Sequence, residues 1–284
     1  MFISPMLLET AKHPFSNEHY LFEPKIDGHR LVLSRQGGQT RLYTRHHNDC
    51  TFQYPELNPV ALDDVILDGE VAATDASGAI DFEAVMERFA LRRADKVRRA
   101  AAERPVNYIV FDVLRYNGVD LRGLPLYRRK EILAGIDFGN PHMAKVPVVP
   151  KEGERLFEQI AARQLEGIVA KRMDSVYVGH RSEAWLKIIN WQYAEVYLTG
   201  YKKEGFGWLA ASAGPGGILK PAGLIELGIT PKHRTAFNGV RDQLQTGEDG
   251  EFVYLEPKLK AKVKMRNWTR AGLLRSPVFM EFCR

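Results

Sequence analysis

A lysine at the end of an apolar strand is the first residue whose setting suggests covalent chemistry. Lys25 stands in the segment EPKIDGHR, residues 23–30, with Arg30 five positions further on. A neighbouring cation disfavours protonation of an amine, and a drop of ~3 units from the ordinary lysine pKa would raise the nucleophilic fraction roughly a thousandfold. A lysine beside Asp-Gly is more often a solvated turn residue, so this segment alone leaves both interpretations open.

Four further segments place charged or aromatic side chains at the edges of apolar strands. They are residues 67–70 (LDGE), 108–114 (YIVFDVL), 165–172 (LEGIVAKR) and 185–188 (WLKI). An acid inside such a strand, here Glu70 or Glu166, is costly unless it meets a cation or a metal ion, which is typical of a functional site. A single acid of this kind is more readily explained by a structural ion pair. The indication of a functional site therefore comes from these segments taken together.

In this order and spacing, the five segments resemble the motifs of the covalent nucleotidyltransferases, which include ATP-dependent DNA ligases, RNA ligases and mRNA capping enzymes. The resemblance covers essentially the whole chain. Residues 265–269 (MRNWT) and 274–279 (LRSPVF) are similar to the end of the ATP-dependent DNA ligases of the bacterial end-joining type. RNA ligases and capping enzymes fit less well there and remain the alternative.

The resemblance implies a mechanism in which Lys25 attacks the α-phosphate of ATP, expels pyrophosphate and carries AMP through a phosphoramide bond. AMP then passes to a DNA 5′-phosphate, and the neighbouring 3′-hydroxyl displaces it. Glu166 matches a carboxylate that binds Mg²⁺ or Mn²⁺. Arg275 matches an arginine that orients the departing pyrophosphate, and Arg45 matches one that faces the 5′-phosphate of the nick.

The resemblance also implies a set of nucleotide-binding residues. Arg30 would contact the nucleotide, Glu70 would bind the ribose, and Phe111 would stack on adenine. Lys187 would contact the α-phosphate, but the family usually carries a second lysine two positions later, where this chain has Ile189. Either Lys187 works alone, or Lys171 or Arg172 covers the phosphate. The expected set is Glu23, Arg30, Glu70, Phe111, Lys171 and Lys187.

Binding to DNA can be argued without the family. Lys258, Lys260, Lys262 and Lys264 recur at every second position, with apolar residues between them. On a strand, this spacing puts four ammonium groups on one face. The pattern favours a face that follows DNA phosphates over an edge strand that uses lysines to block aggregation.

The sequence also suggests a metal site and a non-catalytic function as alternatives. His46 and His47 with Asp49 would suggest a metal site, but adjacent histidines on a strand point to opposite faces, which disfavours it. A non-catalytic DNA-binding protein with an OB domain is the rival from another functional class, and it would not become labelled by ATP.

The apolar patterns around these residues predict an α+β fold. Strands are expected at residues 29–35 and 40–44, joined by a turn, and at 65–73, 106–114 and 167–172. Helices are expected over residues 81–102 and 152–164. The basic face of the first helix is expected to be solvated; it carries Arg88, Arg92, Arg93, Lys96, Arg98 and Arg99.

The pattern changes near residue 190, which predicts two domains, 1–190 and 191–284. The resemblance implies that the first is a nucleotidyltransferase domain of antiparallel sheets with flanking helices. The second shows short strands at residues 195–201, 207–213, 252–254 and 259–265 and a helix at 232–244. This inventory is typical of a small OB-fold β-barrel.

Composition narrows the functional class. The net charge is +5, and all of it lies after residue 190, where 14 Lys and Arg face 9 Asp and Glu. A neutral body with a basic second part fits an enzyme that meets a polyanion. Two cysteines and no apolar run of membrane-spanning length predict a reduced, cytosolic protein. We expect a monomer that acts on nicked or broken double-stranded DNA, with DNA end-binding repair proteins as potential partners.

Overall fold

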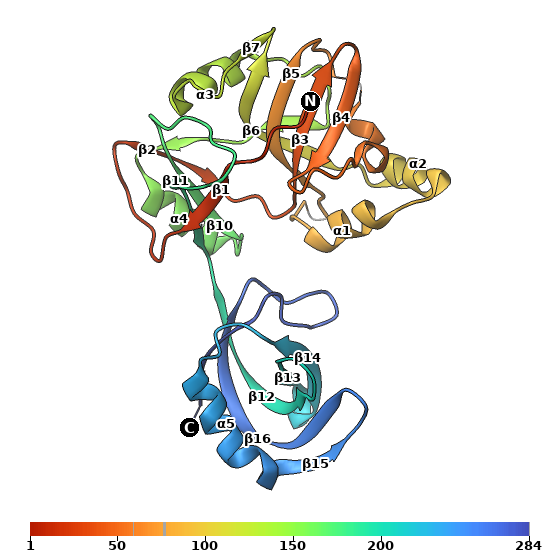
Figure 1. The fold of residues 1–284 in the computed structure, drawn as a ribbon, viewed down its shortest axis with the longest axis vertical. Helices are drawn as coiled ribbons and strands as arrows, with labels where there is room; N and C mark the ends of the chain where they lie inside the picture. The colour runs from red at the N-terminus through yellow and green to blue at the C-terminus, as the bar shows by residue number, and fades with distance from the viewer. Residues whose placement is uncertain (59, 76–77, 284) are drawn as a thin grey trace. The chain divides into compact units, whose positions relative to one another are not determined.

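The computed structural model describes residues 1–58, 60–75 and 78–283, which divide into two compact units (Figure 1). Unit 1 is Met1–Ile189 and unit 2 is Asn190–Arg284. The division falls one residue before the boundary predicted from the sequence. Each unit has its own buried cluster of apolar side chains, so each is described by itself.

Unit 1 is built on two sheets. The first has the strand order β1-β11-β10-β2-β9, and the second has the order β4-β3-β5-β6-β7 with β8 beside β6. Most pairs are antiparallel, but β1 with β11 and β6 with β8 run parallel, so the expectation of purely antiparallel sheets is wrong. The strands are β1 (Leu7–Thr10), β2 (Tyr20–Pro24), β3 (His29–Gln36), β4 (Gln39–Thr44), β5 (Val65–Ala72), β6 (Asn107–Tyr116), β7 (Val119–Asp120), β8 (Met143–Lys145), β9 (Val149–Pro150), β10 (Gly167–Arg172) and β11 (Arg181–Ile189).

The two sheets share a core, and each also buries its other face. Alternate residues of β3 show this directly, because Val32 belongs to the cluster between the sheets while Leu31 and Leu33 belong to the cluster on the far side. A strand buried on both faces carries a nearly continuous apolar run, as β3, β5 and β6 do. Leu156 and Ile160 of α4 cover the remaining face of the first sheet.

The helices of unit 1 are α1 (Phe82–Ala90), α2 (Ala94–Glu103), α3 (Leu126–Gly135) and α4 (Gly153–Ala162), with single 3-10 turns η1 (Thr51–Gln53) and η2 (Pro55–Leu57). Asp81 caps α1 by accepting a hydrogen bond from the backbone N–H of Ala84. The hairpin of β3 and β4 and the strand β10 are confirmed. Helix α4 agrees with its predicted range to within two residues.

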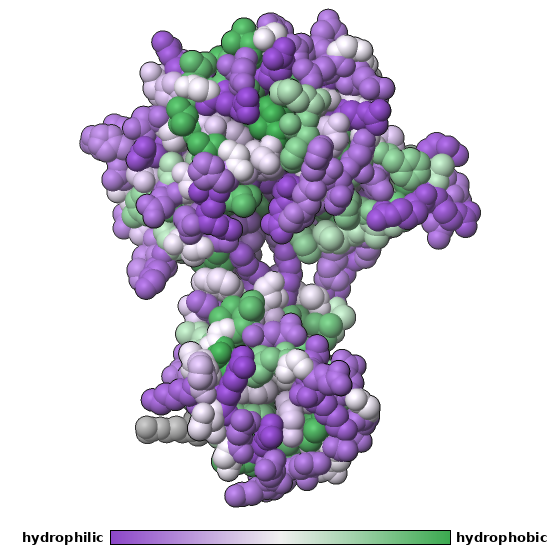
Figure 2. Space-filling view, viewed as in Figure 1, coloured by the Kyte–Doolittle hydropathy of each residue, from purple (hydrophilic) through white to green (hydrophobic). Residues whose placement is uncertain are grey.

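The single helix predicted over residues 81–102 is wrong. The chain is extended at Leu91 and Arg93, which separates α1 from α2. Arg88 is buried rather than solvated, because its guanidinium pairs with Glu56 at 2.8 Å and donates to the carbonyl of Gln53. The other basic side chains of this segment are exposed, and Figure 2 shows a mainly hydrophilic surface at its outer edge.

Unit 2 is a six-stranded sheet with one helix. The strand order is β14-β13-β12-β16-β15, with β17 paired to β16. Thr230 caps α5 by accepting a hydrogen bond from the N–H of His233, and Pro231 occupies its first turn. The elements are β12 (Gln192–Lys202), β13 (Trp208–Ala213), η3 (Pro215–Gly217), β14 (Leu219–Ile225), α5 (Pro231–Leu244), β15 (Gln245–Glu248), β16 (Phe252–Met265) and β17 (Val278–Phe282).

Two predictions for unit 2 need correction. The strands expected at residues 252–254 and 259–265 are one long strand, β16, interrupted by a bulge around Pro257. The sheet is not a closed barrel, since the described strands on its two sides are joined only by an isolated bridge between Leu227 and Val278. Its core is aromatic, with Trp208 packed against Phe237 and Phe279. The predicted helix is confirmed as α5.

Crossing a bilayer requires a long and strongly apolar helix. None of the described helices is both long and apolar enough to cross a membrane.

Candidate active site

The pairing of β2 with β10 brings Lys25 and Glu166 together. Lys25 follows the last residue of β2, and Glu166 precedes the first residue of β10. Because the strands run antiparallel with Pro24 opposite Ile168, these two positions become neighbours. The Nζ atom of Lys25 donates to Oε2 of Glu166 at 2.7 Å, and only a fifth of the lysine side chain is exposed.

Two glycines allow the backbone to close around this pair. A Cβ atom on Gly28 would lie 2.0 Å from the carbonyl oxygen of Val71. Gly167 has a φ of +145° and would clash in the same way with the carbonyl of Ile188. Only glycine fits such positions, so the Asp-Gly and Glu-Gly pairs reflect close packing against β5 and β11 rather than open turns.

Arg30 is held by a buried acid on the neighbouring strand. Its guanidinium donates to both oxygens of Asp68, at 3.0 and 2.6 Å, and the hydroxyl of Tyr177 donates to the same carboxylate at 2.6 Å. Asp68 is fully buried. The charge of Arg30 is therefore already paired, and so is that of Lys25. We expected the charge of Arg30 to act on Lys25. Instead, Arg30 forms an ion pair with Asp68 and Lys25 forms one with Glu166.

Glu70 lies opposite Arg30 in the pairing of β3 with β5. Burial raises the pKa of Glu70 to about 8, against the opposing pull of the charges on Lys25 and Arg30. The negative charge of Glu166 adds to the rise, which places both carboxylates in the same small region. A carboxyl group of this kind is largely protonated near neutral pH and can donate a hydrogen bond.

A second cluster of charges lies beside the aromatic ring of Phe111. Glu23 forms ion pairs with Lys171, at 2.7 Å, and with Lys130 of α3. Burial opposes the charge of Glu23, but the two lysines lower its pKa below the ordinary value. The ammonium group of Lys171 lies 4.3 Å from the ring centre of Phe111 and 4.1 Å from that of Trp185. Burial lowers the pKa of Lys171 to about 8.

The structure gives Lys187 and Ile189 different surroundings. Lys187 is half-buried on β11 and pairs through its backbone with Val169 of β10. Ile189 is 7% exposed, so it fills apolar space where the related enzymes usually carry a lysine. The ammonium group of Lys171 contacts Glu23 and two aromatic rings.

Arg45 and its neighbours lie in the turn after β4. Arg45 is exposed, and its Nε atom lies 2.9 Å from Nε2 of His46. His46 and His47 are therefore in a turn, not on a strand as we assumed, and the ring of His47 stacks on Phe2. Burial lowers the pKa of His29 to about 4, and the positive charge of Arg45 adds to this.

The remaining predicted residues belong to unit 2. Arg275 is half-buried between β16 and β17, and its backbone N–H donates to the carbonyl of Asn267 at 3.0 Å. Lys260, Lys262 and Lys264 pair with β12 in regular register. Lys258 does not join that register, because it lies in the bulge of β16, where it forms an ion pair with Glu256 at 2.9 Å. All four lysines lie on β16, and three of them pair with β12.

Metal ligands in the site are few. Within the described residues, no group of three or more His, Cys, Asp or Glu side chains could hold a metal ion by itself. Glu166 offers one carboxylate beside Lys25, whereas Glu70 is largely protonated near neutral pH. A single carboxylate suits Mg²⁺, which proteins usually bind through one or two carboxylates together with substrate phosphates.

Sequence reasoning missed several residues that hold this site. Lys130 contacts Glu23 and Asp68 contacts Arg30, two side chains that were predicted to bind the nucleotide, and Tyr177 in turn donates to Asp68. Asp68 stands in the LDGE segment that the sequence analysis singled out, but the sequence does not show that it pairs with Arg30. Lys130 lies on α3, whose sequence LYRRKEILAG has no continuous apolar stripe, and neither the helix nor the lysine was predicted.

In unit 1, which is built from two mixed sheets, a half-buried lysine donates a hydrogen bond from its amine to a glutamate carboxylate. This arrangement is the one expected of the covalent nucleotidyltransferases. A model of the ATP-dependent DNA ligase domain matches residues 5–188. The chain belongs to the ATP-dependent DNA ligase family. The RNA ligase, capping enzyme and non-catalytic alternatives are therefore not favoured.

Similarity to individual proteins extends beyond the matched domain. The chain is 39% identical over 281 residues to the SPbeta prophage-derived DNA ligase-like protein LigB of Bacillus subtilis, covering 98% of each chain. It is 30% identical over 280 residues to the multifunctional non-homologous end joining DNA repair protein LigD of Mycobacterium tuberculosis, covering 90% of this chain but 35% of that protein. The solved structure of mycobacterial DNA ligase D complexed with ATP and MES is 25% identical, with a TM-score of 0.58 over 99% of this chain and 95% of that one.

Proposed function

We propose that this ATP-dependent DNA ligase seals nicks through an adenylated Lys25. The contact that carries the proposal is the 2.7 Å hydrogen bond between Lys25 Nζ and Glu166. The amine forms a P–N bond to the α-phosphorus of ATP, the bond to the pyrophosphate oxygen breaks, and the amine loses its proton. Glu166 orients Nζ before the reaction and accepts the released proton at Oε2 as the P–N bond forms.

Phosphoryl transfer depends mostly on positioning and on neutralising charge. Glu166 and the substrate phosphates would hold Mg²⁺ or Mn²⁺, whose charge favours the neutral amine and offsets the charge on the transferred phosphate. We assign the α-phosphate to Lys187 and the departing pyrophosphate to Arg275 of unit 2. Arg45 would face the 5′-phosphate of the nick.

The nucleoside would be held at the junction of β2, β5 and β6. Phe111 offers a ring for adenine, and Glu70, protonated near neutral pH, can hydrogen-bond a ribose hydroxyl. Arg30 would act from its fixed position on Asp68. Glu23, Lys130 and Lys171 would form the polar end of the pocket, next to the ring of Phe111.

We propose that unit 2 is an OB-type module that contacts DNA. Three exposed or half-exposed rings lie beside the lysines of β16: Tyr193 and Tyr197 on β12 and Trp191 just before it. The ammonium groups of Lys260 and Lys264 are 5.1 and 4.8 Å from the ring centres of Tyr197 and Trp191. We call this set, with Lys262, the lysine–aromatic face. Cations interleaved with aromatic rings are typical of surfaces that bind nucleic acid.

The function is tested by following the label from nucleotide to protein to DNA. Incubation with α-labelled ATP should label the protein, whereas GTP should not. Adding nicked duplex DNA should move the label from protein to AMP as the strand is sealed. Sealing of a nicked RNA duplex in preference to DNA would contradict the proposal. Failure of ATP to label the protein would exclude the lysyl-AMP route.

The lysine–aromatic face gives a prediction about salt. Changing Lys260, Lys262 and Lys264 together to Gln should make the slope of log affinity for nicked DNA against log salt shallower by roughly 2 to 3, at about 0.9 per phosphate contact. The loss should be similar for any DNA sequence, because phosphate contacts carry no base information. Fluorescence anisotropy over a salt series measures the slope.

A matched control uses exposed lysines elsewhere in unit 2. The variant K220Q/K232Q removes two charges from β14 and α5 and should leave the slope nearly unchanged. An unchanged slope in the triple variant, with its unfolding midpoint preserved, would show that these lysines protect the sheet and that DNA is bound elsewhere.

We also propose that the chain acts as a monomer on nicked or broken double-stranded DNA, in the bacterial cytosol where such DNA lies. DNA end-binding repair proteins are its proposed partners, because the similar LigD proteins are named for non-homologous end joining.

A further inference from the structure

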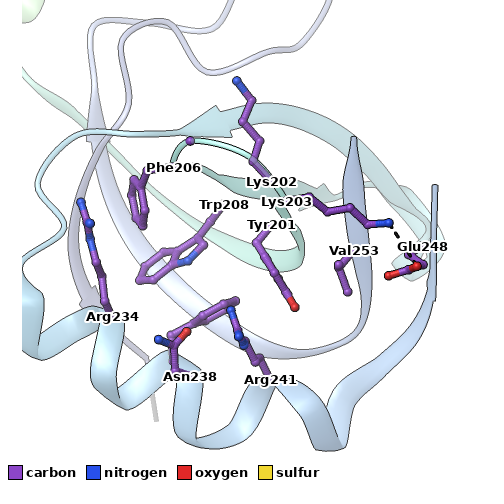
Figure 3. Close-up of a pocket in the computed structure, with 13 residues that line it drawn as sticks. Tyr201, Lys202, Lys203, Phe206, Trp208, Arg234, Asn238, Arg241, Glu248 and Val253 are labelled. Atoms are coloured by element: carbon purple, nitrogen blue, oxygen red, sulfur yellow. Dashed lines mark ion pairs between the residues drawn. The ribbon is translucent and has the colours of Figure 1, made fainter. Parts of the chain in front are cut away.

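Unit 2 contains a groove that the adenylation chemistry does not use. It has a volume of about 500 Å³ and lies between α5 and the turn that joins β12 to β13 (Figure 3). The rings of Tyr201, Trp208 and Phe237 line it, and the last two belong to the core of the unit. The volume is within the range of ligand-binding pockets, and the lysine–aromatic face shares no residue with it.

Two arginines of α5 reach this groove with their orientation set by aromatic rings. Arg234 and Arg241 are seven residues apart and therefore lie on the same face of the helix, two turns from each other. The guanidinium carbon of Arg234 is 3.9 Å from the ring centre of Phe206, and that of Arg241 is 4.8 Å from the ring centre of Tyr201. Stacking occupies the flat face of a guanidinium and leaves the N–H donors at its edge available.

The groove carries a surplus of positive charge. Lys202, Lys203, Arg234 and Arg241 line it against a single acid, Glu248. Lys203 pairs with Glu248 at 3.1 Å, and Lys202 lies 3.6 Å from Glu226.

The two arginines are less well neutralised than the lysines. Arg241 has only the exposed neighbour Asp242, at 3.4 Å, and its Nε atom makes no hydrogen bond there within the described residues. No carboxylate of the described residues forms an ion pair with Arg234. The edges of the two stacked guanidiniums are thus the part of the groove that an anionic ligand would neutralise.

We propose that this groove binds an acidic peptide segment of a partner protein, with one apolar side chain inserted over the aromatic floor. Carboxylates suit the edges of the two guanidiniums, because such pairs are bidentate and charge-assisted. The backbone of duplex DNA offers anions but no apolar group for a concave floor. Lining by Tyr, Trp and Arg is typical of the residues that dominate protein–protein binding. This inference is independent of the roles assigned to Lys25 and Glu166.

The test is an array of nonapeptides that carry four acidic residues around one central position, which is varied among aromatic, aliphatic and polar residues. Each peptide has a partner in which Gln and Asn replace the acids. The full chain should bind the acidic peptides with an aromatic or aliphatic centre and should not bind their neutral partners. For the best peptide, fluorescence anisotropy should show a dissociation constant at least about tenfold higher for R234Q/R241Q.

The charge-matched control is K220Q/K232Q, in which neither lysine lines the groove. It should change the peptide affinity by less than about twofold, as expected for exposed charges. Both variants should become labelled by ATP as the unchanged protein does, which confirms that the fold survives.

Three results would overturn the inference. Binding of acidic peptides that R234Q/R241Q does not weaken would place their site elsewhere. No binding of any acidic peptide above its neutral partner would leave the groove as solvated surface. Tighter binding of single-stranded oligodeoxythymidine, lost in R234Q/R241Q but not in the control, would make the groove a nucleic-acid contact.

Discussion

Lys25→Ala should carry no covalent AMP at any ATP concentration, with labelling at background level. The amine that forms the P–N bond is absent, and with it the contact to Glu166 that orients a nucleophile. Lys25→Arg should fail in the same way, because a guanidinium remains protonated. The measurement is label that stays with the denatured protein on gel electrophoresis after incubation with α-labelled ATP.

The control for this experiment is Lys12→Ala, which removes an exposed lysine of unit 1. It should become labelled as the unchanged protein does. Binding of nicked DNA by Lys25→Ala should remain close to normal, because the lysine–aromatic face is intact. Label on Lys25→Ala near the unchanged level would refute the assignment of the nucleophile.

Arg129→Ala should destabilise unit 1 by about 3–5 kcal/mol, the range for breaking a buried ion pair. The guanidinium of Arg129 is 0% exposed, donates to both oxygens of Asp112 at 2.9 Å, and also donates to the carbonyls of Leu124 and Ser175. Without it, the charge of Asp112 is left buried and unpaired. Urea unfolding followed by circular dichroism measures the loss, with the transitions of the two units fitted separately.

The adjacent arginine provides a matched control. Arg128 pairs with Glu131 at 2.8 Å on the surface of the same helix, where both side chains are more than half exposed. Arg128→Ala should cost about 0–1 kcal/mol. The double variant R129M/D112N removes both buried charges and should recover part of the loss. Equal effects of Arg129→Ala and Arg128→Ala would show that burial of the Asp112 pair adds nothing to stability.

Local patterns predicted those elements whose formation depends on nearby residues. The hairpin of β3 and β4 follows from two runs of strand-forming residues on either side of Gly37-Gly38, and both glycines have positive φ as such a turn requires. Helix α5 follows from the Thr230-Pro231 start. The break between α1 and α2 was missed, because residues 81–102 keep helical spacing across Leu91–Arg93.

Prediction was poorest where polar residues are buried. Helix α3 was missed because Arg129 lies on its buried side and Lys130 reaches Glu23, so the helix shows no simple apolar face. Arg88 was expected in solvent for the related reason that its partner, Glu56, is 32 residues away in the sequence. A buried ion pair looks like two surface residues until both partners are known.

The sequence by itself determined which chemical groups this protein carries and in what order: a lysine, acids, an arginine and an aromatic ring at strand edges, sufficient to indicate a nucleotidyltransferase. Only the tertiary structure decided which groups meet. Lys25 pairs with Glu166 across 141 positions, and Arg30 with Asp68 across 38. Both contacts depend on strand register, because a shift of one residue would turn each side chain to the opposite face of its sheet. Register is a property of the packed sheets, so no single segment encodes it.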